Sequence, residues 1–429
     1  MRAGDVIELS VERIDLDATG LARAGKTTVS VPALFAGERA RVRIEHVSRA
    51  SPRAHGRVLE RVSSLPSRRA APCPQHPDKG GKCNGCGLMA LEDEAQREQK
   101  RRMLAGLGLE VDALVAPGPS LGYRFSSKRV VFGRRGSVRL GSYERGTHTG
   151  ADMRGCLVEH PRIAAAADEL ADQATRLGIE PYDEKRHEGD LRYVWLKTDG
   201  RRVLVTLVTR TEDSRAAREL PSVLRLADGV AHSVHRDADN ALRGTAARAL
   251  SGVGSLTVEL AGVATDVVPL GFLQPNPRAI EHAYRLLAGA PPGRLALDLY
   301  AGSGTTTALL RERFERVVAC ESYPESARAL GVEPEPVERF LERWRERPDL
   351  AVANPPRKGL GQAVCAGLIV LAAPRLHVMS CGPEGLARDL ARLCAGGYRV
   401  ERLVAVDALP QTPHVELVAL LVRGSPSTD

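Results

Sequence analysis

Short runs of alternating apolar and polar residues occupy the first part of the chain, from Asp5 to Arg61, and turn residues such as Gly20 and Pro32 separate them. An alternation with a period of two is typical of strands that bury one face. The predicted strands cover residues 6–9, 21–23, 28–31, 40–44 and 56–59. Five short strands within about 60 residues are typical of a small closed barrel of the oligonucleotide-binding kind.

A longer, strand-rich region follows this barrel. Residues 63–72 form a Pro-rich linker, and a charged amphipathic helix is predicted over residues 88–109. Alternation then predicts a central α+β unit, with strands at residues 128–132, 138–143, 191–196, 202–208 and 256–260 and helices at 163–177 and 240–250.

From Pro269 onward, strands alternate with helices. The predicted strands cover residues 295–300, 317–321, 350–353, 375–379 and 415–422, and a helix is predicted at 305–314. This order is typical of an α/β, Rossmann-like domain with a mostly parallel, doubly wound sheet, in which ligands bind at the carboxyl ends of the strands. We therefore expect a barrel at residues 1–62, a central α+β domain at 63–268 and a catalytic domain at 269–429, on which the helix at 88–109 is expected to pack.

Positive charge is concentrated in the barrel. The 429-residue chain has a formal net charge of +8, and residues 39–69 contain nine arginines against Glu45 and Glu60. A concentrated basic segment is the electrostatic footprint of a protein that binds a phosphate backbone, although a merely solvated arginine-rich surface gives the same composition. A second basic group with the same two readings comprises Arg124, Lys128, Arg129, Arg134, Arg135 and Arg139.

The apolar runs are short. None approaches the roughly 18 residues that a membrane span needs, and the first ten residues lack the apolar core of a signal peptide. We therefore expect a cytoplasmic protein with no membrane partner, most simply a monomer.

Four of the eight cysteines suggest a metal site, because a cytoplasmic chain rarely uses cysteines in disulfides. Cys83 and Cys86 flank an Asn-Gly turn that aims two thiolates at one point, and Cys73 lies nearby. Cys156, in another polar loop, is the best candidate for a fourth ligand, since the remaining cysteines are expected to be buried. Four thiolates suit either tetrahedral zinc or a four-iron cluster.

A glycine turn follows the first strand of the catalytic domain. Residues 298–304 read DLYAGSG, and Glu321 ends the next predicted strand. The glycines let the backbone approach a ligand closely, and a carboxylate at Glu321 can accept hydrogen bonds from both ribose hydroxyls of a nucleoside cofactor. The absence of a G-x-G-x-x-G pattern favours S-adenosylmethionine over a dinucleotide.

Cys381 is the candidate nucleophile. It lies between an apolar strand and Pro383, which suits the first turn of a helix. A helix N-terminus lowers the pKa of a thiol, and this position leaves the sulfur accessible. An inert cysteine at a strand end is the competing interpretation.

Four segments together resemble the bacterial RNA uracil-5-methyltransferases, over nearly the whole chain. They are Gly271-Phe272-Leu273-Gln274-Pro275-Asn276, the turn at residues 297–304, Met379-Ser380-Cys381-Gly382-Pro383, and Leu409-Pro410-Gln411-Thr412-Pro413-His414-Val415-Glu416. Residues 14–22 and 31–38 resemble the TRAM domain, an RNA-binding barrel. The barrel and the four cysteines resemble the branch of the family that acts on large-subunit ribosomal RNA, in which the cysteines Cys73, Cys83, Cys86 and Cys156 would hold a [4Fe-4S] cluster.

The resemblance implies a covalent mechanism. Cys381 would add to carbon 6 of uracil, which turns carbon 5 into a nucleophile that attacks the methyl sulfonium, and Glu416 would remove the proton from carbon 5. The target base would be flipped out of its stack. The predicted cofactor-binding residues are Gln274, Asp298, Tyr300, Gly302, Thr305, Glu321 and Asn354.

Two features depart from the family pattern. Asn354 stands where the family has an aspartate in its Asp-Pro-Pro-Arg motif, and an amide donates as well as accepts hydrogen bonds. The segment between Glu321 and Asn354 is shorter than is usual, so that Glu333 or Glu335 would have to replace an acidic residue beside the adenine. The alternatives are therefore an RNA-binding protein with a degenerate catalytic domain, or an enzyme that acts on a tRNA uridine or on cytosine.

Overall fold

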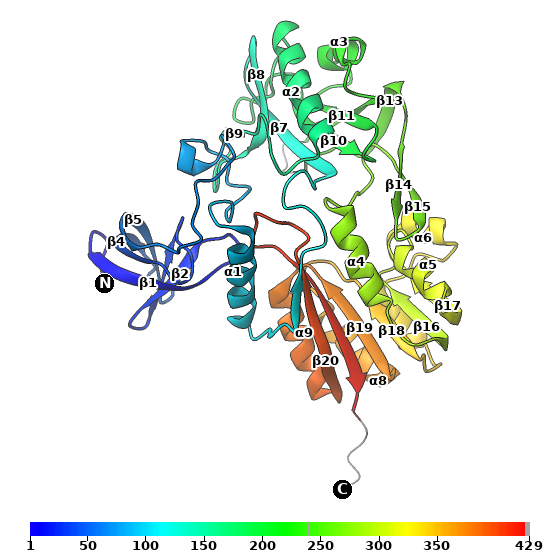
Figure 1. The fold of residues 1–429 in the computed structure, drawn as a ribbon. Coiled ribbons are helices and arrows are strands. Elements are labelled where there is room, and N and C mark those ends of the chain that lie inside the picture. Colours follow the sequence, from blue (N-terminus) through cyan, green and yellow to red (C-terminus); the bar gives the residue numbers. More distant parts are fainter. Residues whose placement is uncertain (238–240, 425–429) are drawn as a thin grey trace.

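The computed structural model describes residues 1–237 and 241–424, and its elements form a barrel, a central sheet and a sheet covered by helices on both faces (Figure 1). The first five strands close into a barrel in the order β1-β2-β3-β5-β4. Apolar residues at alternate positions, such as Leu9 and Val11, fill its interior. The predicted barrel is thus confirmed, with the strands β1 (Val6–Ile14), β2 (Gly20–Ala24), β3 (Thr27–Val31), β4 (Arg39–Val47) and β5 (Arg53–Ser63).

The segment after the barrel joins the other two units. It contains a 3-10 turn (Pro77–Lys79), helix α1 (Asp93–Ala105) and strand β6 (Ala113–Val115). The helix is shorter at both ends than the predicted 88–109. Its residues Met103 and Leu104 share one hydrophobic core with Leu295 of the catalytic sheet and Phe35 of the barrel. Strand β6 pairs with strand β20 (Tyr398–Val406), so this part of the chain extends the catalytic sheet.

The central sheet has seven strands, in the order β13-β12-β11-β10-β7-β8-β9. Helices α2 (Pro161–Arg176) and α3 (Arg215–Val223) contribute to the core on one of its faces. Its strands are β7 (Ser126–Arg134), β8 (Ser137–Tyr143), β9 (Gly150–Asp152), β10 (Leu191–Thr198), β11 (Val203–Thr209), β12 (Gly229–Val234) and β13 (Ala247–Gly252).

The helix predicted at residues 240–250 is wrong. Residue 240 lies outside the described part of the chain, and residues 247–252 form β13, which pairs antiparallel with β12 at the edge of the sheet. The alanines here favour a helix in isolation, but pairing with a sheet overrides a weak local propensity.

A hairpin of β14 (Leu256–Leu260) and β15 (Val263–Val267) leads into the catalytic domain. The strand order of the catalytic sheet is β17-β16-β18-β19-β21-β20-β6, and only β21 runs antiparallel to its neighbours. The expected Rossmann-like, mostly parallel sheet is therefore confirmed. Its remaining strands are β16 (Gly293–Leu299), β17 (Phe314–Cys320), β18 (Leu350–Ala353), β19 (Arg375–Ser380) and β21 (Glu416–Arg423).

Helices cover both faces of this sheet. One face packs against α4 (Pro277–Leu287) and α5 (Thr305–Arg311), and the other against α7 (Val337–Arg343), α8 (Gly361–Leu371) and α9 (Pro383–Ala395). A short α6 (Pro324–Leu330) follows β17. Helix α5 ends before the predicted residue 314, because Phe314 already begins β17.

The strand directions bring the candidate residues to one edge. Strands β16, β17, β18 and β19 are parallel, so their carboxyl ends meet there, and the antiparallel β21 begins at the same edge. Within the described residues, no helix has the length and apolar character needed to cross a membrane.

Candidate active site

Cys381 and Glu416 face each other across neighbouring strands. Cys381 comes directly after β19, and Glu416 is the first residue of β21. Because Ser380 pairs with Leu417 in the antiparallel register, the next position on each strand is Cys381 and Glu416. Both residues are partly exposed, so both can contact a ligand at the edge of the sheet.

Arg357 completes this group. The loop after β18 carries it, and a Cβ atom on Gly382 would lie 2.4 Å from the Arg357 carbonyl oxygen, so the loop lies directly against the turn of Cys381. Buried Asp389 of α9 holds the loop by accepting a 2.7 Å hydrogen bond from the Leu360 amide and one from Gly361.

The charges of this group act on one another. Burial raises the pKa of the Cys381 thiol, the Glu416 carboxylate raises it further, and the Arg357 guanidinium opposes both. The lowered thiol pKa expected from the helix N-terminus is therefore wrong. Burial also raises the pKa of Glu416 to about 7, again against Arg357. A carboxyl group with a pKa near neutrality suits proton transfer.

Gln274 approaches the same edge from the loop before helix α4. Its amide lies 3.5 Å from the Tyr284 hydroxyl. Burial raises the pKa of Tyr284, and the charges of Glu416 and Asp298 contribute in the same direction. One polar cluster at this edge therefore contains Gln274, Tyr284 and Glu416.

The glycine turn and Glu321 form a second polar group at this edge. Tyr300, Gly302 and Gly304 have left-handed φ angles of 61°, 56° and 85°. The Gly302 amide donates a 2.8 Å hydrogen bond to Glu321, whose other oxygen accepts a 2.6 Å bond from the Tyr323 amide. A Cβ atom on Gly302 would meet no atom within 4 Å, so the turn faces open space. This arrangement fits a nucleoside cofactor against the backbone of the turn.

Two predicted cofactor residues lie deeper. Asp298 is buried, accepts a 2.6 Å hydrogen bond from the Thr307 hydroxyl, and has a pKa that burial raises to about 7. Thr305 begins α5, and its hydroxyl lies 3.5 Å from that of Ser303. Both therefore stabilise the turn and its helix from below.

The short segment between Glu321 and Asn354 places few of the predicted polar side chains at the cofactor site. Asn354 follows β18, and its backbone amide donates a 3.3 Å hydrogen bond to Leu299, so it does reach the carboxyl edge. Glu333 is exposed. Glu335 forms an ion pair with Arg343 at 2.6 Å.

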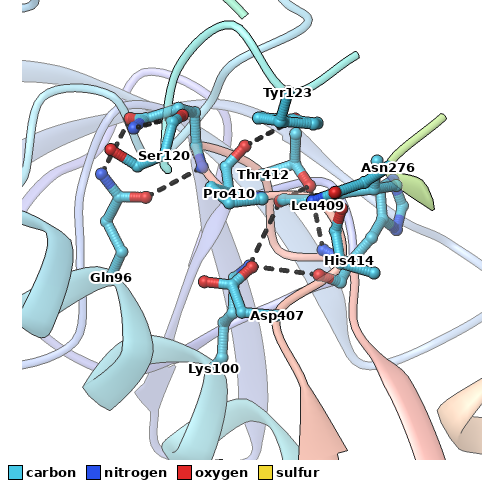
Figure 2. Close-up of polar contacts among 12 residues, drawn as sticks. Gln96, Lys100, Ser120, Tyr123, Asn276, Asp407, Leu409, Pro410, Thr412 and His414 are labelled. Atoms are coloured by element: carbon cyan, nitrogen blue, oxygen red, sulfur yellow. Dashed lines mark hydrogen bonds and ion pairs between the residues drawn. The ribbon is translucent and has the colours of Figure 1, made fainter. Parts of the chain in front are cut away.

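The segment between β20 and β21, residues 407–415, is tied down from several sides (Figure 2). The Asn276 amide donates a 3.0 Å hydrogen bond to Ala408, and the Tyr123 hydroxyl donates one of 2.9 Å to Pro410. The Thr412 hydroxyl closes the turn on Leu409 at 2.7 Å. Burial lowers the pKa of His414, and Arg357 acts in the same direction, so this ring belongs to the same group of charges.

The four candidate ligands Cys73, Cys83, Cys86 and Cys156 line one small cavity. All four are partly exposed. Burial raises the pKa of Cys86, and the other three thiols raise it further. Within residues 1–237 and 241–424, however, no group of three or more His, Cys, Asp or Glu side chains could hold a metal ion. Of the other cysteines, Cys320 and Cys365 are buried as expected, whereas Cys394 is exposed.

A wide cleft between the central sheet and the catalytic domain carries positive charge. Its lining includes Arg124, Lys128 and Arg243 together with Phe272 and Tyr323. The Lys128 ammonium lies 4.1 Å from the centre of the Trp195 ring, which leaves an aromatic and cationic surface in the cleft. Arg129 does not belong to this surface, because it is buried and paired with Glu159.

The sequence motifs assigned no role to Arg357, Tyr284 or Lys100. Lys100 is fully buried and contacts the segment before Glu416. The signal for Lys100 is a spacing: Gln96, Lys100 and Met103 fall at intervals that place polar residues on the apolar face of the helix.

Comparison with known proteins identifies the family. No protein-family model matches the chain. An uncharacterized RNA methyltransferase of Geobacter sulfurreducens is 30% identical over 100% of this chain and 92% of its own length. A second, from Halalkalibacterium halodurans, is 27% identical over 97% of each chain.

A solved structure agrees with these matches. The tRNA (uracil-54, C5)-methyltransferase of Pyrococcus abyssi, in complex with S-adenosyl-L-homocysteine, superposes with a TM-score of 0.76 and 25% identity, covering 96% of this chain and 100% of that one. The resemblance to the RNA uracil-5-methyltransferases is thereby confirmed, and the chain belongs to the S-adenosylmethionine-dependent RNA methyltransferases.

Proposed function

We propose that this enzyme methylates carbon 5 of uridine in a structured RNA, most specifically in large-subunit ribosomal RNA, through a covalent adduct with Cys381. The observation that carries the proposal is the pairing of Cys381 with Glu416 across β19 and β21, with Arg357 beside both. A thiol and a carboxyl group at one edge are the two groups that this reaction needs.

The reaction proceeds in three balanced steps. The Cys381 thiolate forms a bond to carbon 6 of uracil, and the electron pair of the 5,6 double bond moves into the ring as an enolate. Carbon 5 would then attack the methyl group of S-adenosylmethionine, whose sulfur–methyl bond would break so that S-adenosylhomocysteine leaves with the electron pair. The Glu416 carboxylate removes the proton from carbon 5, the double bond re-forms, and the carbon–sulfur bond breaks to release the thiolate.

Arg357 and Gln274 support these steps. The Arg357 guanidinium stabilises the thiolate before attack, since its charge opposes the rise in the pKa of Cys381 that burial and Glu416 cause. Gln274 offers an amide that can both donate to and accept from the edge of the base. The Asn354 side chain can also donate a hydrogen bond. Whether this amide contacts the substrate base or the cofactor decides whether the enzyme prefers uracil or cytosine.

S-adenosylmethionine is proposed to lie along the turn at Gly302. Tyr300, Thr305 and Asp298 hold the turn, and Glu321 accepts hydrogen bonds from the ribose. The open space above Gly302 supports this position, because the backbone there can approach a ligand without a side chain in between.

The cysteine site is proposed to hold a [4Fe-4S] cluster rather than zinc. The donor set fits, because Cys73, Cys83, Cys86 and Cys156 line one cavity. A single zinc ion draws its thiolates to about 2.3 Å from one point, whereas a cluster binds each cysteine through a separate iron and spaces the sulfur atoms more widely. The choice of a cluster rests on the resemblance to the ribosomal-RNA branch, in which four cysteines hold a [4Fe-4S] cluster.

RNA is proposed to bind across the barrel and the basic cleft in the cytoplasm. The TRAM-like barrel presents exposed arginines, including Arg41, Arg43 and Arg57. The cleft adds Lys128 and the exposed ring of Phe272, which can stack on bases.

One assay tests the reaction. The purified protein is incubated with labelled S-adenosylmethionine and ribosomal RNA or tRNA that lacks the modification, and the RNA is digested to nucleosides. We expect label in 5-methyluridine, mainly from ribosomal RNA. Label in 5-methylcytidine would show that the enzyme acts on cytosine, and label only in tRNA would show that it acts on a tRNA uridine. RNA binding without label would indicate a degenerate enzyme.

Two variants test the residues. Cys381→Ala should remove both turnover and the covalent adduct. Glu416→Gln should slow turnover by about 100-fold or more and leave an RNA–protein adduct that survives denaturing electrophoresis. Cys394→Ala, an exposed cysteine away from these groups, serves as the control.

Iron analysis and the visible spectrum of an anaerobic preparation test the cluster. We expect a brown protein whose colour is lost in Cys156→Ser, while a colourless, zinc-containing protein would contradict this part of the proposal.

A further inference from the structure

Helix α1 buries three polar side chains, Gln96, Gln99 and Lys100. The spacing of three and four residues places them on one side of the helix. A buried polar group costs free energy unless it is hydrogen-bonded, and a buried charge costs more. Their partners therefore indicate what the helix does.

The Lys100 ammonium binds both ends of the segment before Glu416. It donates hydrogen bonds to the Asp407 carboxylate at 2.5 Å, to the His414 carbonyl at 3.1 Å and to the Leu409 carbonyl at 3.3 Å. An ammonium group has three donors, and all three are used. Leu409 and His414 lie at the two ends of the turn, so one side chain holds both ends together (Figure 2).

Gln96, one helical turn earlier, holds the middle of the same segment. Its amide donates a 2.8 Å hydrogen bond to the Gln411 side chain, and its oxygen accepts a 2.9 Å bond from the Gln411 backbone amide. Gln411 is fully buried and has a left-handed φ of 69°. An uncommon conformation of this kind persists when the surroundings over-determine it.

The position of Glu416 depends on this segment. On one side, the pairing of Val406 with Glu416 fixes the start of β21. On the other side, only Val415 separates Glu416 from His414, whose carbonyl Lys100 binds. Cys381 instead follows β19, whereas the three hydrogen bonds of Lys100 go to Asp407, Leu409 and His414, so Lys100 acts on the side of Glu416.

We propose that Lys100 is a positioning residue which, together with Gln96, holds residues 409–414 so that the Glu416 carboxylate points at the proton on carbon 5. The inference rests on the proposed function and extends it. Loss of Lys100 should spare the addition of Cys381 and the methyl transfer but slow proton removal. A misplacement of about 1 Å can reduce a rate by about 100-fold.

The test removes both buried charges, because Lys100→Met alone would leave Asp407 buried without a cation and could prevent folding. Lys100→Met is therefore combined with Asp407→Leu. The control is Arg102→Met, which removes an exposed cation from the same helix, where Arg102 pairs with Glu98.

We expect the double variant to fold and to keep its KM for RNA and for S-adenosylmethionine. Its kcat should fall by about 10-fold to 100-fold, and a methylated RNA–protein adduct should accumulate, as in Glu416→Gln. The Arg102→Met control should turn over like the unaltered enzyme and accumulate no adduct.

Two outcomes separate the inference from the function beneath it. If Glu416→Gln forms no adduct, the proposed covalent mechanism is wrong whatever Lys100 does. If Glu416→Gln forms the adduct and the double variant turns over normally, or loses adduct formation as well as turnover, Lys100 does not position Glu416.

Discussion

Near neutral pH the Glu416 carboxyl group is partly protonated and partly ionised, because burial raises its pKa to about 7. Proton removal from carbon 5 needs the ionised carboxylate, which predominates only above that pH. Burial and Glu416 also raise the pKa of Cys381, so that its thiolate becomes more abundant as the pH increases.

The first prediction concerns this pH dependence. The single-turnover rate of 5-methyluridine formation should rise with pH and bend near pH 7, where Glu416 ionises. In Glu416→Gln the bend near pH 7 should disappear from the residual rate. A profile that is flat between pH 6 and 8 would contradict the role of Glu416 as base.

The second prediction concerns Arg357. In Arg357→Met, loss of the neighbouring cation should raise the pKa of the Cys381 thiol by about one pH unit. The pH dependence of iodoacetamide alkylation, followed by mass spectrometry of the Cys381 peptide, measures this change without RNA. Lys358→Met, an exposed neighbour in the same loop, should leave the alkylation profile unchanged.

The role of a single residue could be predicted where that residue belongs to a local sequence motif. Cys381, Glu416 and the glycine turn follow from their flanking residues, and the structure brings them to one edge. Arg357 could not be assigned a role in the same way, because its approach to Cys381 depends on how α9 holds the loop. Nor could the sequence show that burial outweighs the helix N-terminus at Cys381.

At the scale of elements, the glycine turn after β16 allows a clean experiment, since its two glycines differ in their surroundings. A Cβ atom at Gly302 would meet no neighbour, whereas one at Gly304 would lie 2.5 Å from Leu330. Both have left-handed φ angles, so alanine brings a conformational cost of about 1 kcal/mol at either position.

The third prediction follows from this difference. Gly302→Ala should weaken S-adenosylmethionine binding in calorimetry by about 10-fold, roughly 1.4 kcal/mol, while it changes the melting temperature only slightly. Gly304→Ala should lower the melting temperature more, because of the contact with Leu330. Unchanged cofactor affinity in Gly302→Ala would exclude the turn as the binding surface.

The regular elements were predictable wherever periodicity was strong. The barrel strands alternate, and the parallel strands β16, β17, β18 and β19 are short apolar runs, so both were predicted at nearly their true positions, whereas β20 was not predicted. The prediction failed at residues 247–252, because an edge strand with few apolar residues shows no periodic alternation. Helix α1 was expected only as a charged amphipathic helix, because the spacing of Gln96, Lys100 and Met103 signals an inward-facing row but not which residues lie opposite it.

At the scale of the whole molecule, positive charge extends from the barrel to the central cleft. The fourth prediction is that RNA affinity falls steeply with salt. Lys128→Met should weaken binding at all sequences and reduce the slope of log affinity against log salt by about 1. Arg129→Met is unsuitable for this purpose because Arg129 is buried with Glu159, so exposed Arg201→Met serves as the matched control.

Changes of rhythm along the chain predict three units and the packing of α1 on the catalytic domain, but the other contacts between the units could not be predicted. The barrel loop that carries Asp17 and Thr19 binds Arg145 of the central region, with distances of 3.0 and 2.9 Å. Such contacts join residues far apart in the chain, and only the folded arrangement brings them together.

The bonds of Gln99 have a consequence for how independent the barrel is. The Gln99 side chain accepts a 2.8 Å hydrogen bond from the Ala36 amide of the barrel and donates one of 3.0 Å to the Ala36 carbonyl. Gln99 shares its helix with Gln96 and Lys100, so opening of the barrel and release of residues 409–414 should be one cooperative event in hydrogen exchange. A chain shortened to residues 64–429 would retain every catalytic residue, yet it would lose the neighbour that keeps α1 ordered and would be expected to exchange its Gln411 amide rapidly.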